Sequence, residues 1–226
     1  MTRSNQPDIR PDEGPAESHG RFDLLLISMV SVYLLSAFAS GRWVDALRVL
    51  LFTVVAVQAL RGSLLPKRTV RLILAAVLAG SAVMLTLSFT TETGRGIADI
   101  WAGLLLLFAV VVNVRRVLST RTVTMQNIYG ALAAYLMIGV AFAAFFTAIH
   151  YLSGGHFFAQ GQPDSTQAIQ YFSFTTLAAL GYGDFTAAGD LGRALADLEA
   201  LTGQIFLVTL VAFLVTQFRA AGEQKR

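Results

Sequence analysis

The sequence predicts an all-α membrane protein with six transmembrane helices and a short re-entrant helix between the fifth and the sixth. Of its 226 residues, 55% are hydrophobic and 14% are charged, whereas about 25% are charged in ordinary globular proteins. A soluble protein of this size has too little polar surface to cover so many apolar side chains. The chain has no cysteine, which excludes a disulfide scaffold, an iron–sulfur cluster and a thiolate zinc site.

Long segments with few or no charged residues locate the membrane-spanning helices. A helix that crosses the hydrocarbon core needs about 20 mostly apolar residues. Spans are predicted near residues 22–40, 43–60, 70–90, 97–114, 127–151 and 191–218. The second contains two charged residues, Asp45 and Arg48. These two residues are three apart and share a helix face, so we expect them to pair near the lipid headgroups.

Positive charges indicate the orientation in the membrane. Of the 17 Lys and Arg residues, all but Arg42, Arg48, Arg95 and Arg193 fall in segments on the same side as the amino terminus. The positive-inside rule therefore places both termini in the cytoplasm, in a multi-pass protein of the cell membrane. The net charge of +3 follows from this topology and indicates no nucleic-acid partner.

Two tails flank the predicted spans. Residues 1–21 combine Pro7, Pro11 and Pro15 with acidic and Ser residues, a composition typical of a disordered cytoplasmic tail. They lack the apolar core of a cleaved signal peptide, so we expect the first span to be retained as a membrane helix. Residues 219–226 form a cytoplasmic tail too short for a sensor domain. We therefore expect that a regulator is missing or lies in another protein.

The segment after the fifth span departs from a simple helix–loop–helix pattern. Its glycine and proline residues predict a loop on the outer side: Gly154, Gly155, Gly161 and Pro163. Asp164 and Ser165 then offer side-chain oxygens that can cap a helix. Residues 166–177 form an apolar stretch of 12 residues, about 18 Å of helix. Because this is too short to cross the membrane, we expect the helix to enter it and turn back.

A glycine-containing segment, residues 179–184 (Ala-Leu-Gly-Tyr-Gly-Asp), follows this short helix. Non-helical backbone cannot face lipid, so the segment is expected to line a path for water or ions. Gly181 and Gly183 permit backbone angles that would strain other residues, and they allow successive carbonyls to point towards one axis. The carboxyl end of the short helix is the negative end of its dipole. Both features favour a partly dehydrated cation, and no enzyme requires this geometry.

The segment resembles the selectivity filter of the potassium channel family. That family's filter reads Thr-Val-Gly-Tyr-Gly-Asp and follows a threonine-rich pore helix. Thr175 and Thr176 stand at the corresponding place here, and Gly203 follows at a spacing similar to that in the family's inner helix. The resemblance covers residues 125–218 as a pore domain of outer helix, pore helix, filter and inner helix. Residues 22–118, a four-helix transmembrane domain, match the family only in number of helices and topology.

The resemblance implies roles for the filter residues. Stacked rings of carbonyl oxygens would replace the hydration shell of potassium, and they would come from Ala179, Leu180, Gly181 and Tyr182. Gly183 would complete the outer mouth, and Asp184 would brace it from behind. Support from the pore helix would come from Phe172, Thr175 and Thr176. Because the chain contains one filter, four chains would form a homotetramer in the lipid bilayer. Conduction would be passive, with no cofactor and no metal besides the permeant potassium.

The chain departs from the family pattern at four places. Ala179 replaces the Thr whose hydroxyl completes the innermost ion site, and Leu180 replaces Val. Phe172 stands where many members have Trp, the usual donor to the filter tyrosine, and Ala187 stands where Pro often follows the filter. The implied function is a passive cation channel selective for potassium. The alternatives are a weakly selective cation channel and a non-conducting subunit that anchors or regulates partners in the membrane.

Few residues suggest a gating device. The fourth predicted span holds one acid, Asp99, and no base, so steep voltage gating is not expected. Gly203 is a candidate hinge in the inner helix, or else a small residue for close helix packing. Asp197 and Glu199 cannot share a helix face. We expect one of them to pair with Arg193 or with the back of the pore helix, in a bracing role.

An enzyme is the contrasting hypothesis. His150 and His156 lie near the outer interface with Asp164 downstream, and imidazoles there are candidates for a metal or proton-transfer site. The chain lacks the His-Glu-x-x-His and Gly-x-Ser-x-Gly patterns that would accompany a hydrolase. Interfacial histidines with their polar tips in water are therefore the favoured interpretation, and no enzymatic activity is expected.

Overall fold

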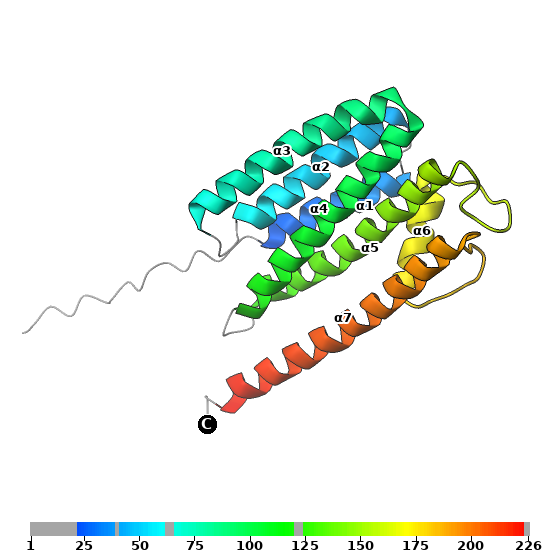
Figure 1. Ribbon diagram of the computed structural model, residues 1–226. Helices are drawn as coiled ribbons and strands as arrows, with labels where there is room; N and C mark the ends of the chain where they lie inside the picture. The colour runs from blue at the N-terminus through cyan, green and yellow to red at the C-terminus, as the bar shows by residue number, and fades with distance from the viewer. Residues whose placement is uncertain (1–21, 39–40, 62–65, 120–123, 224–226) are drawn as a thin grey trace, which may run out of the picture.

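The computed structural model describes residues 22–38, 41–61, 66–119 and 124–223. Its helices (Figure 1) are α1 (Phe22–Phe38), α2 (Arg42–Arg61), α3 (Lys67–Thr90), α4 (Glu92–Ser119), α5 (Met125–Ser153), α6 (Thr166–Leu177) and α7 (Asp190–Glu223). The predicted tail 1–21 and residues 224–226 lie outside the described residues. The short helix has its predicted bounds, whereas α7 continues past the predicted end at residue 218.

Helix α5 lies at the centre of the bundle. It contacts α1, α4, α6 and α7, while α2 and α3 pack against α4. The start of α1 and the end of α7 lie at one end of the bundle, and the loops around α6 lie at the other (Figure 1). Small residues on the buried surface of α5 let the neighbouring backbones approach closely: Gly130, Ala131, Ala134, Ala141 and Ala144.

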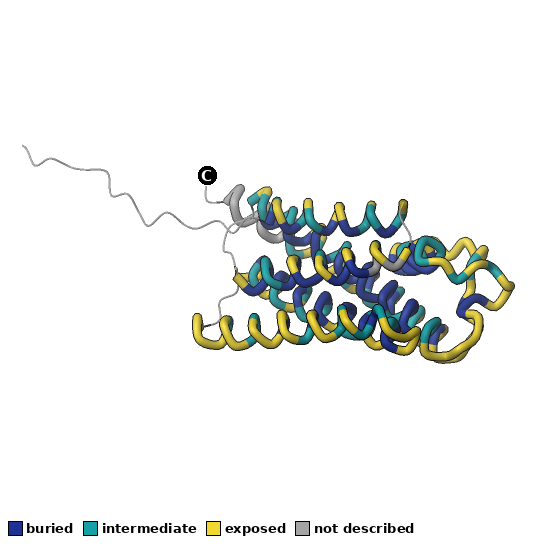
Figure 2. The backbone as a smooth tube through the Cα atoms, turned by 90° about the horizontal axis from the view of Figure 1, so that it is seen from above, coloured by how far each residue is buried: buried dark blue, intermediate teal, exposed yellow. Residues whose placement is uncertain are grey.

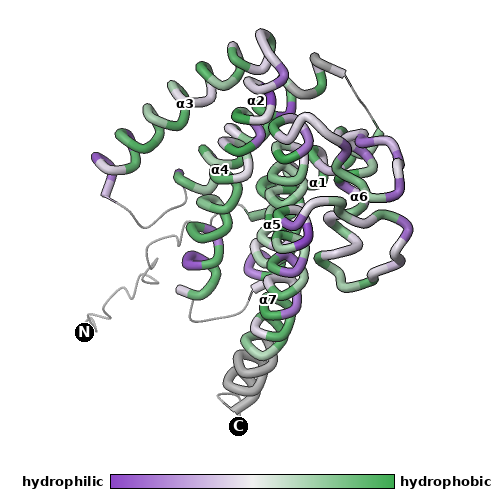
Figure 3. The backbone as a smooth tube through the Cα atoms, turned by 45° about the vertical axis from the view of Figure 1, so that its right-hand side comes forward, coloured by the Kyte–Doolittle hydropathy of each residue, from purple (hydrophilic) through white to green (hydrophobic). Residues whose placement is uncertain are grey.

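Four of the predicted spans are long and apolar enough to cross a membrane. Among the described residues these are α3, α4, α5 and the Asp190–Phe213 part of α7. α1 is apolar but has 17 residues, and α2 contains charged residues, so six spans remain a prediction. Exposed residues run along α3 (Figure 2), and they include the apolar Leu72 and Leu78. The hydrophobic character of α3 (Figure 3) therefore fits contact with lipid.

Three apolar cores among the described residues hold the helices together, and the smallest joins α2, α3 and α4 through Ala56, Leu60, Val77 and Leu105. The first joins α1, α2, α4 and α5 through side chains such as Met29, Phe52, Leu106 and Met137. The second joins α5 and α6 to the loop between them, and most of its large side chains are phenylalanines. This second core positions the candidate site, because α6 and the residues that follow it rest on it.

A buried ion pair joins α2 to α4. Arg48 was predicted to pair with Asp45, whose side chain lies outside the described residues. The Arg48 Nη2 atom lies 4.0 Å from Asp99 Oδ1, with the two side chains 7% and 16% exposed. Spacing along one helix suggests a partner on that helix, but the packing of α4 against α2 provides another. The acid in the fourth span thus has a structural contact that sequence spacing did not indicate.

Candidate functional site

Capping residues define the ends of α6. Ser165 is the N-cap, and its Oγ accepts a backbone hydrogen bond in the first turn at 3.1 Å, as its residue type predicts. Asp164, the other predicted cap, binds the preceding loop instead. α6 ends at Leu177, and Ala178 closes the last turn by donating its N–H to the Phe174 carbonyl. The end of α6 therefore fixes the position at which the following segment begins, at residue 178.

The backbone of residues 178–184 alternates in hand. Ala179, Gly181 and Gly183 have φ values of 53°, 56° and 78°, in the left-handed region, while the residues between them have negative φ. This alternation allows successive carbonyls to point to one side, as expected from the two glycines. Ala179 is the only described non-glycine residue with a positive φ, which its residue type does not predict. Its methyl group makes that angle unfavourable by about 1–2 kcal/mol.

Backbone hydrogen bonds hold the start of this segment against α6. The N–H groups of Ala179 and Leu180 donate to the carbonyls of Thr176 and Thr175 at 2.9 and 2.8 Å, respectively. The Thr175 hydroxyl donates to the Tyr171 carbonyl at 3.0 Å and so stays within α6. The two threonines predicted to support a filter thus contact the 178–184 segment through their backbone carbonyls.

Phe172 belongs to an aromatic cluster beneath the loop after α5. Its ring centroid lies 5.2 Å from that of Phe146, 5.7 Å from Phe157 and 5.8 Å from Phe158. The Phe158 ring also packs on Phe185, which follows the glycine-containing segment, at 4.8 Å. Two backbone hydrogen bonds, of 2.9 and 2.8 Å, join the same loop to the residues that follow Phe185. Phe172 therefore supports the loop and the end of the segment together.

A side chain of α6 also holds Asp184. The Tyr171 hydroxyl donates a hydrogen bond to the Asp184 carboxylate, and this bond raises the pKa of Tyr171 above its ordinary value. Asp184 Oδ1 accepts the N–H of Phe185 at 3.2 Å, and the Gln162 amide donates to the Asp184 carbonyl. Phe172 has no donor, so the polar contact from α6 comes from its neighbour Tyr171.

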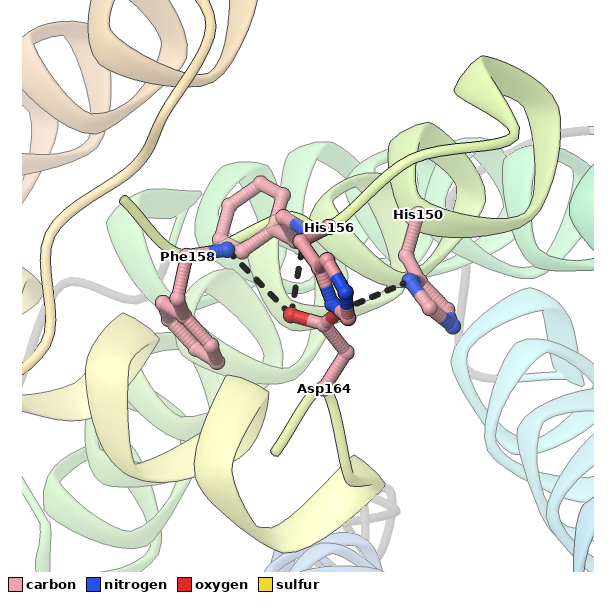
Figure 4. A network of polar contacts seen from close by, with 5 residues as sticks. His150, His156, Phe158 and Asp164 are labelled. Atoms are coloured by element: carbon pink, nitrogen blue, oxygen red, sulfur yellow. Dashed lines mark hydrogen bonds and ion pairs between the residues drawn. The ribbon is translucent and has the colours of Figure 1, made fainter. Parts of the chain in front are cut away.

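Asp164 contacts two histidines, His150 in the last turn of α5 and His156 in the loop that follows (Figure 4). Its Oδ1 accepts the N–H groups of Phe157 and Phe158 at 3.0 and 3.2 Å. Its Oδ2 lies 3.0 Å from His156 Nδ1 and 3.5 Å from His150 Nδ1. The Asp164 side chain is 6% exposed and that of His156 is 80% exposed. Within the described residues, no group of three such side chains is placed to hold a metal ion. The carboxylate thus anchors the loop.

Three helices meet behind the 178–184 segment in what we call the α5–α6–α7 junction. Each contributes two residues that are four apart and so share a face: Tyr135 and Gly139 from α5, Ser173 and Leu177 from α6, and Glu199 and Gly203 from α7. Ser173 Oγ lies 2.7 Å from the Gly139 carbonyl oxygen and 2.5 Å from Glu199 Oε1. Glu199 is fully buried, whereas Asp197 is exposed. The prediction that one of these acids binds the back of the short helix is confirmed.

The second level of the junction surrounds the Leu177 carbonyl. The Tyr135 hydroxyl donates to it at 3.4 Å, and a Cβ added to Gly203 would lie 2.3 Å from the same oxygen. A side chain cannot occupy this space, so α7 passes the end of α6 at a distance that only glycine permits. The structure therefore supports close packing as the role of Gly203, within a continuous helix.

Helix α1 supports α6, a contact that no sequence pattern indicates. Gln170 Nε2 donates to the Tyr33 carbonyl at 3.1 Å, and the rings of Tyr33 and Phe174 meet edge to face with centroids 4.8 Å apart. A cavity of about 350 Å³ lies beside this contact, between α1, α6 and Leu180. The first helix thus contributes directly to the position of α6.

Residues 134–220 match the model of a protein family described as "Ion channel". The matched residues begin within α5 and include α6, the 178–184 segment and most of α7, whereas α1 to α4 lie outside them. The match supports a passive ion channel, and together with the apolar helices it supports a membrane protein. Comparison with curated proteins and with solved structures gave no match.

Proposed function

We propose that the chain is a subunit of a passive cation channel that selects potassium and conducts through the axis of a homotetramer. The observation that carries the proposal is the alternating backbone of residues 178–184, which follows directly on the carboxyl end of α6. Rings of backbone carbonyls can replace the water around a potassium ion. The negative end of the α6 dipole makes the same place favourable for a cation.

In this proposal the carbonyls of residues 179–182 form the stacked rings, one set from each chain. Gly183 forms the mouth, and Asp184 lies behind it, where Tyr171 donates to its carboxylate. Because Ala179 has no hydroxyl, its ion site has a single ring of carbonyl oxygens. The proposal includes no enzymatic activity and no cofactor. The channel lies in the cell membrane with both termini in the cytoplasm.

Exposed apolar side chains support assembly from several copies. Leu180 and Tyr182 are 55% and 66% exposed in the single chain, although both belong to the proposed filter. On α7, exposed apolar residues recur every three or four positions and form one stripe: Leu198, Leu201, Ile205, Val208 and Val211. A ring of four copies would place these side chains between subunits or along the pore, since each chain supplies one quarter of a filter.

Ion flux into liposomes that contain the purified protein tests this proposal. We expect potassium to enter at least about ten times faster than sodium, a preference of about 1.4 kcal/mol. Protein-free liposomes give the background rate. Equal rates for the two ions would overturn potassium selectivity in favour of a weakly selective channel. Background rates for both ions from an intact tetramer would instead favour an anchoring or regulatory subunit.

A further inference from the structure

We infer that Glu199 is a neutral carboxylic acid that donates its proton to Ser173, and that this hydrogen bond positions α6 for conduction. The inference rests on the proposed channel function for its second part only. It concerns the first level of the α5–α6–α7 junction, where Glu199, Ser173 and Gly139 meet behind the proposed filter.

The number of available protons determines the direction of the hydrogen bonds. A serine hydroxyl has one proton to donate and two lone pairs to accept with, whereas a backbone carbonyl can only accept. The 2.7 Å contact with the Gly139 carbonyl therefore uses the Ser173 proton. The 2.5 Å contact between Ser173 Oγ and Glu199 Oε1 then needs a proton from the other partner. That proton belongs to the Glu199 carboxyl group.

The surroundings of Glu199 favour the same protonation state. Its side chain is 0% exposed, and its Oε2 has no hydrogen-bond partner among the described residues. The ion pairs found within those residues involve other acids, so no described cation compensates a charge at this position. A buried carboxylate without a cation is costly, whereas a neutral acid that donates one hydrogen bond carries no charge and is buried at much lower cost.

The geometry connects this bond to the proposed filter. Ser173 lies one turn before Leu177, the last residue of α6, and Glu199 lies one turn before Gly203 on α7. Two contacts on successive turns of α6 thus hold this helix in position. The first is the hydrogen bond that Glu199 donates, and the second is the close contact of Gly203 with the Leu177 carbonyl. Loss of the hydrogen bond from Glu199 would let the end of α6 rotate, and the 178–184 segment starts at that end. Glu199 is therefore a positioning residue that does not itself contact the ion.

Infrared difference spectroscopy tests the protonation state of Glu199. The wild-type spectrum minus that of Glu199→Gln should contain the carbonyl band of a protonated carboxylic acid and should lack carboxylate bands. The band should shift in deuterium oxide once the buried proton exchanges. Asp197→Asn is the matched control, because this exposed acid on the same helix should remove carboxylate bands instead. Carboxylate bands lost in Glu199→Gln would overturn the inference.

Flux measurements test the positioning role. Glu199→Gln, whose amide can donate to Ser173, should keep potassium flux within about twofold of wild type. Glu199→Ala should lower the flux at least about tenfold and reduce the preference for potassium, because the buried Ser173 loses its donor. Size-exclusion chromatography checks that the tetramer persists. Full flux and selectivity in Glu199→Ala would overturn the positioning role, as would a loss in Glu199→Gln equal to that in Glu199→Ala.

The two proposals can fail separately. Absence of flux in the wild type would contradict the channel function, yet the infrared spectra would still decide whether Glu199 is protonated. If Glu199→Ala does not fold, Glu199→Gln and Ser173→Ala remain as tests of positioning. In Ser173→Ala the acceptor of the Glu199 proton is absent, so a flux equal to that of wild type would overturn the role of this bond.

Discussion

Gly181 has a φ of +56°, and a Cβ added to it would meet none of the described atoms within 4 Å. Backbone conformation, with no steric contact involved, therefore sets the cost of Gly181→Ala, about 1–2 kcal/mol. Relief of that strain would turn a carbonyl away from the axis, so we expect potassium flux to fall at least about tenfold in liposomes. Gly189→Ala is the matched control, because Gly189 is equally open but has no positive φ. Equal flux in the two variants would contradict the filter assignment.

Asp164 is the second residue whose substitution should have a measurable effect, in this case on stability. Asp164→Ala removes the acceptor of two backbone N–H groups in a buried place, and we expect a loss of about 1–3 kcal/mol in stability. Thermal unfolding in detergent measures it. His156→Ala is the control, because this histidine is 80% exposed and contacts the other oxygen of the same carboxylate. A larger loss in His156→Ala than in Asp164→Ala would show that the loop is held by the histidine instead.

At the scale of elements, α7 can pack closely on α6 because Gly203 has no side chain. Gly203→Ala would place a methyl group 2.3 Å from a backbone oxygen of α6, which cannot move aside as a side chain can. We expect a destabilisation of about 1–3 kcal/mol, the usual effect of overpacking, with a lower unfolding temperature. Gly192→Ala is a graded control, since its nearest contacts are side chains at 3.0 and 3.2 Å. An unfolding temperature unchanged by Gly203→Ala but altered flux would restore the hinge interpretation.

The elements differ in how far local sequence specifies them. The bounds of α6 could be predicted because Ser165 is a strong cap and the stretch after it contains no charged residue. Gly181 and Gly183 likewise indicate the positive φ angles found at their positions. The left-handed Ala179, the Glu199–Ser173 contact and the Arg48–Asp99 pair could not be predicted. Each depends on where separate helices pack, which residue types and spacing along one helix do not determine.

For the whole molecule, the proposal requires four chains around one axis, and we expect native mass spectrometry of the purified protein to find that number. The absence of native cysteine allows the arrangement to be tested with single introduced thiols. Leu201→Cys on the exposed stripe of α7 should give cross-linked pairs of chains with a bifunctional maleimide. Leu72→Cys on α3, which is 67% exposed, should not. Pairs formed through Leu72→Cys alone would place α3, instead of α7, between the chains.

The part of the chain that matches the family also contacts the part that does not. The family match covers residues 134–220, yet α1 reaches α6 through Gln170 and Phe174. The first helix therefore packs directly on α6, a helix within the matched residues, even though it lies outside them itself. α2 and α3 contact α4 and have no such link to α6 among the described residues.

The contact of Gly203 with the Leu177 carbonyl also makes α7 a lever with a fixed fulcrum. From Gly203 the helix extends about 30 Å to its carboxyl end and about 20 Å to its amino end. A tilt of about 10° about this point would sweep the carboxyl end through roughly 5 Å, while the carbonyl at the fulcrum stays in place. Such a tilt would move the carboxyl end of α7 much further than Glu199, which lies one turn from Gly203, so in the proposed channel an opening motion at that end would reach the α5–α6–α7 junction only as a small displacement.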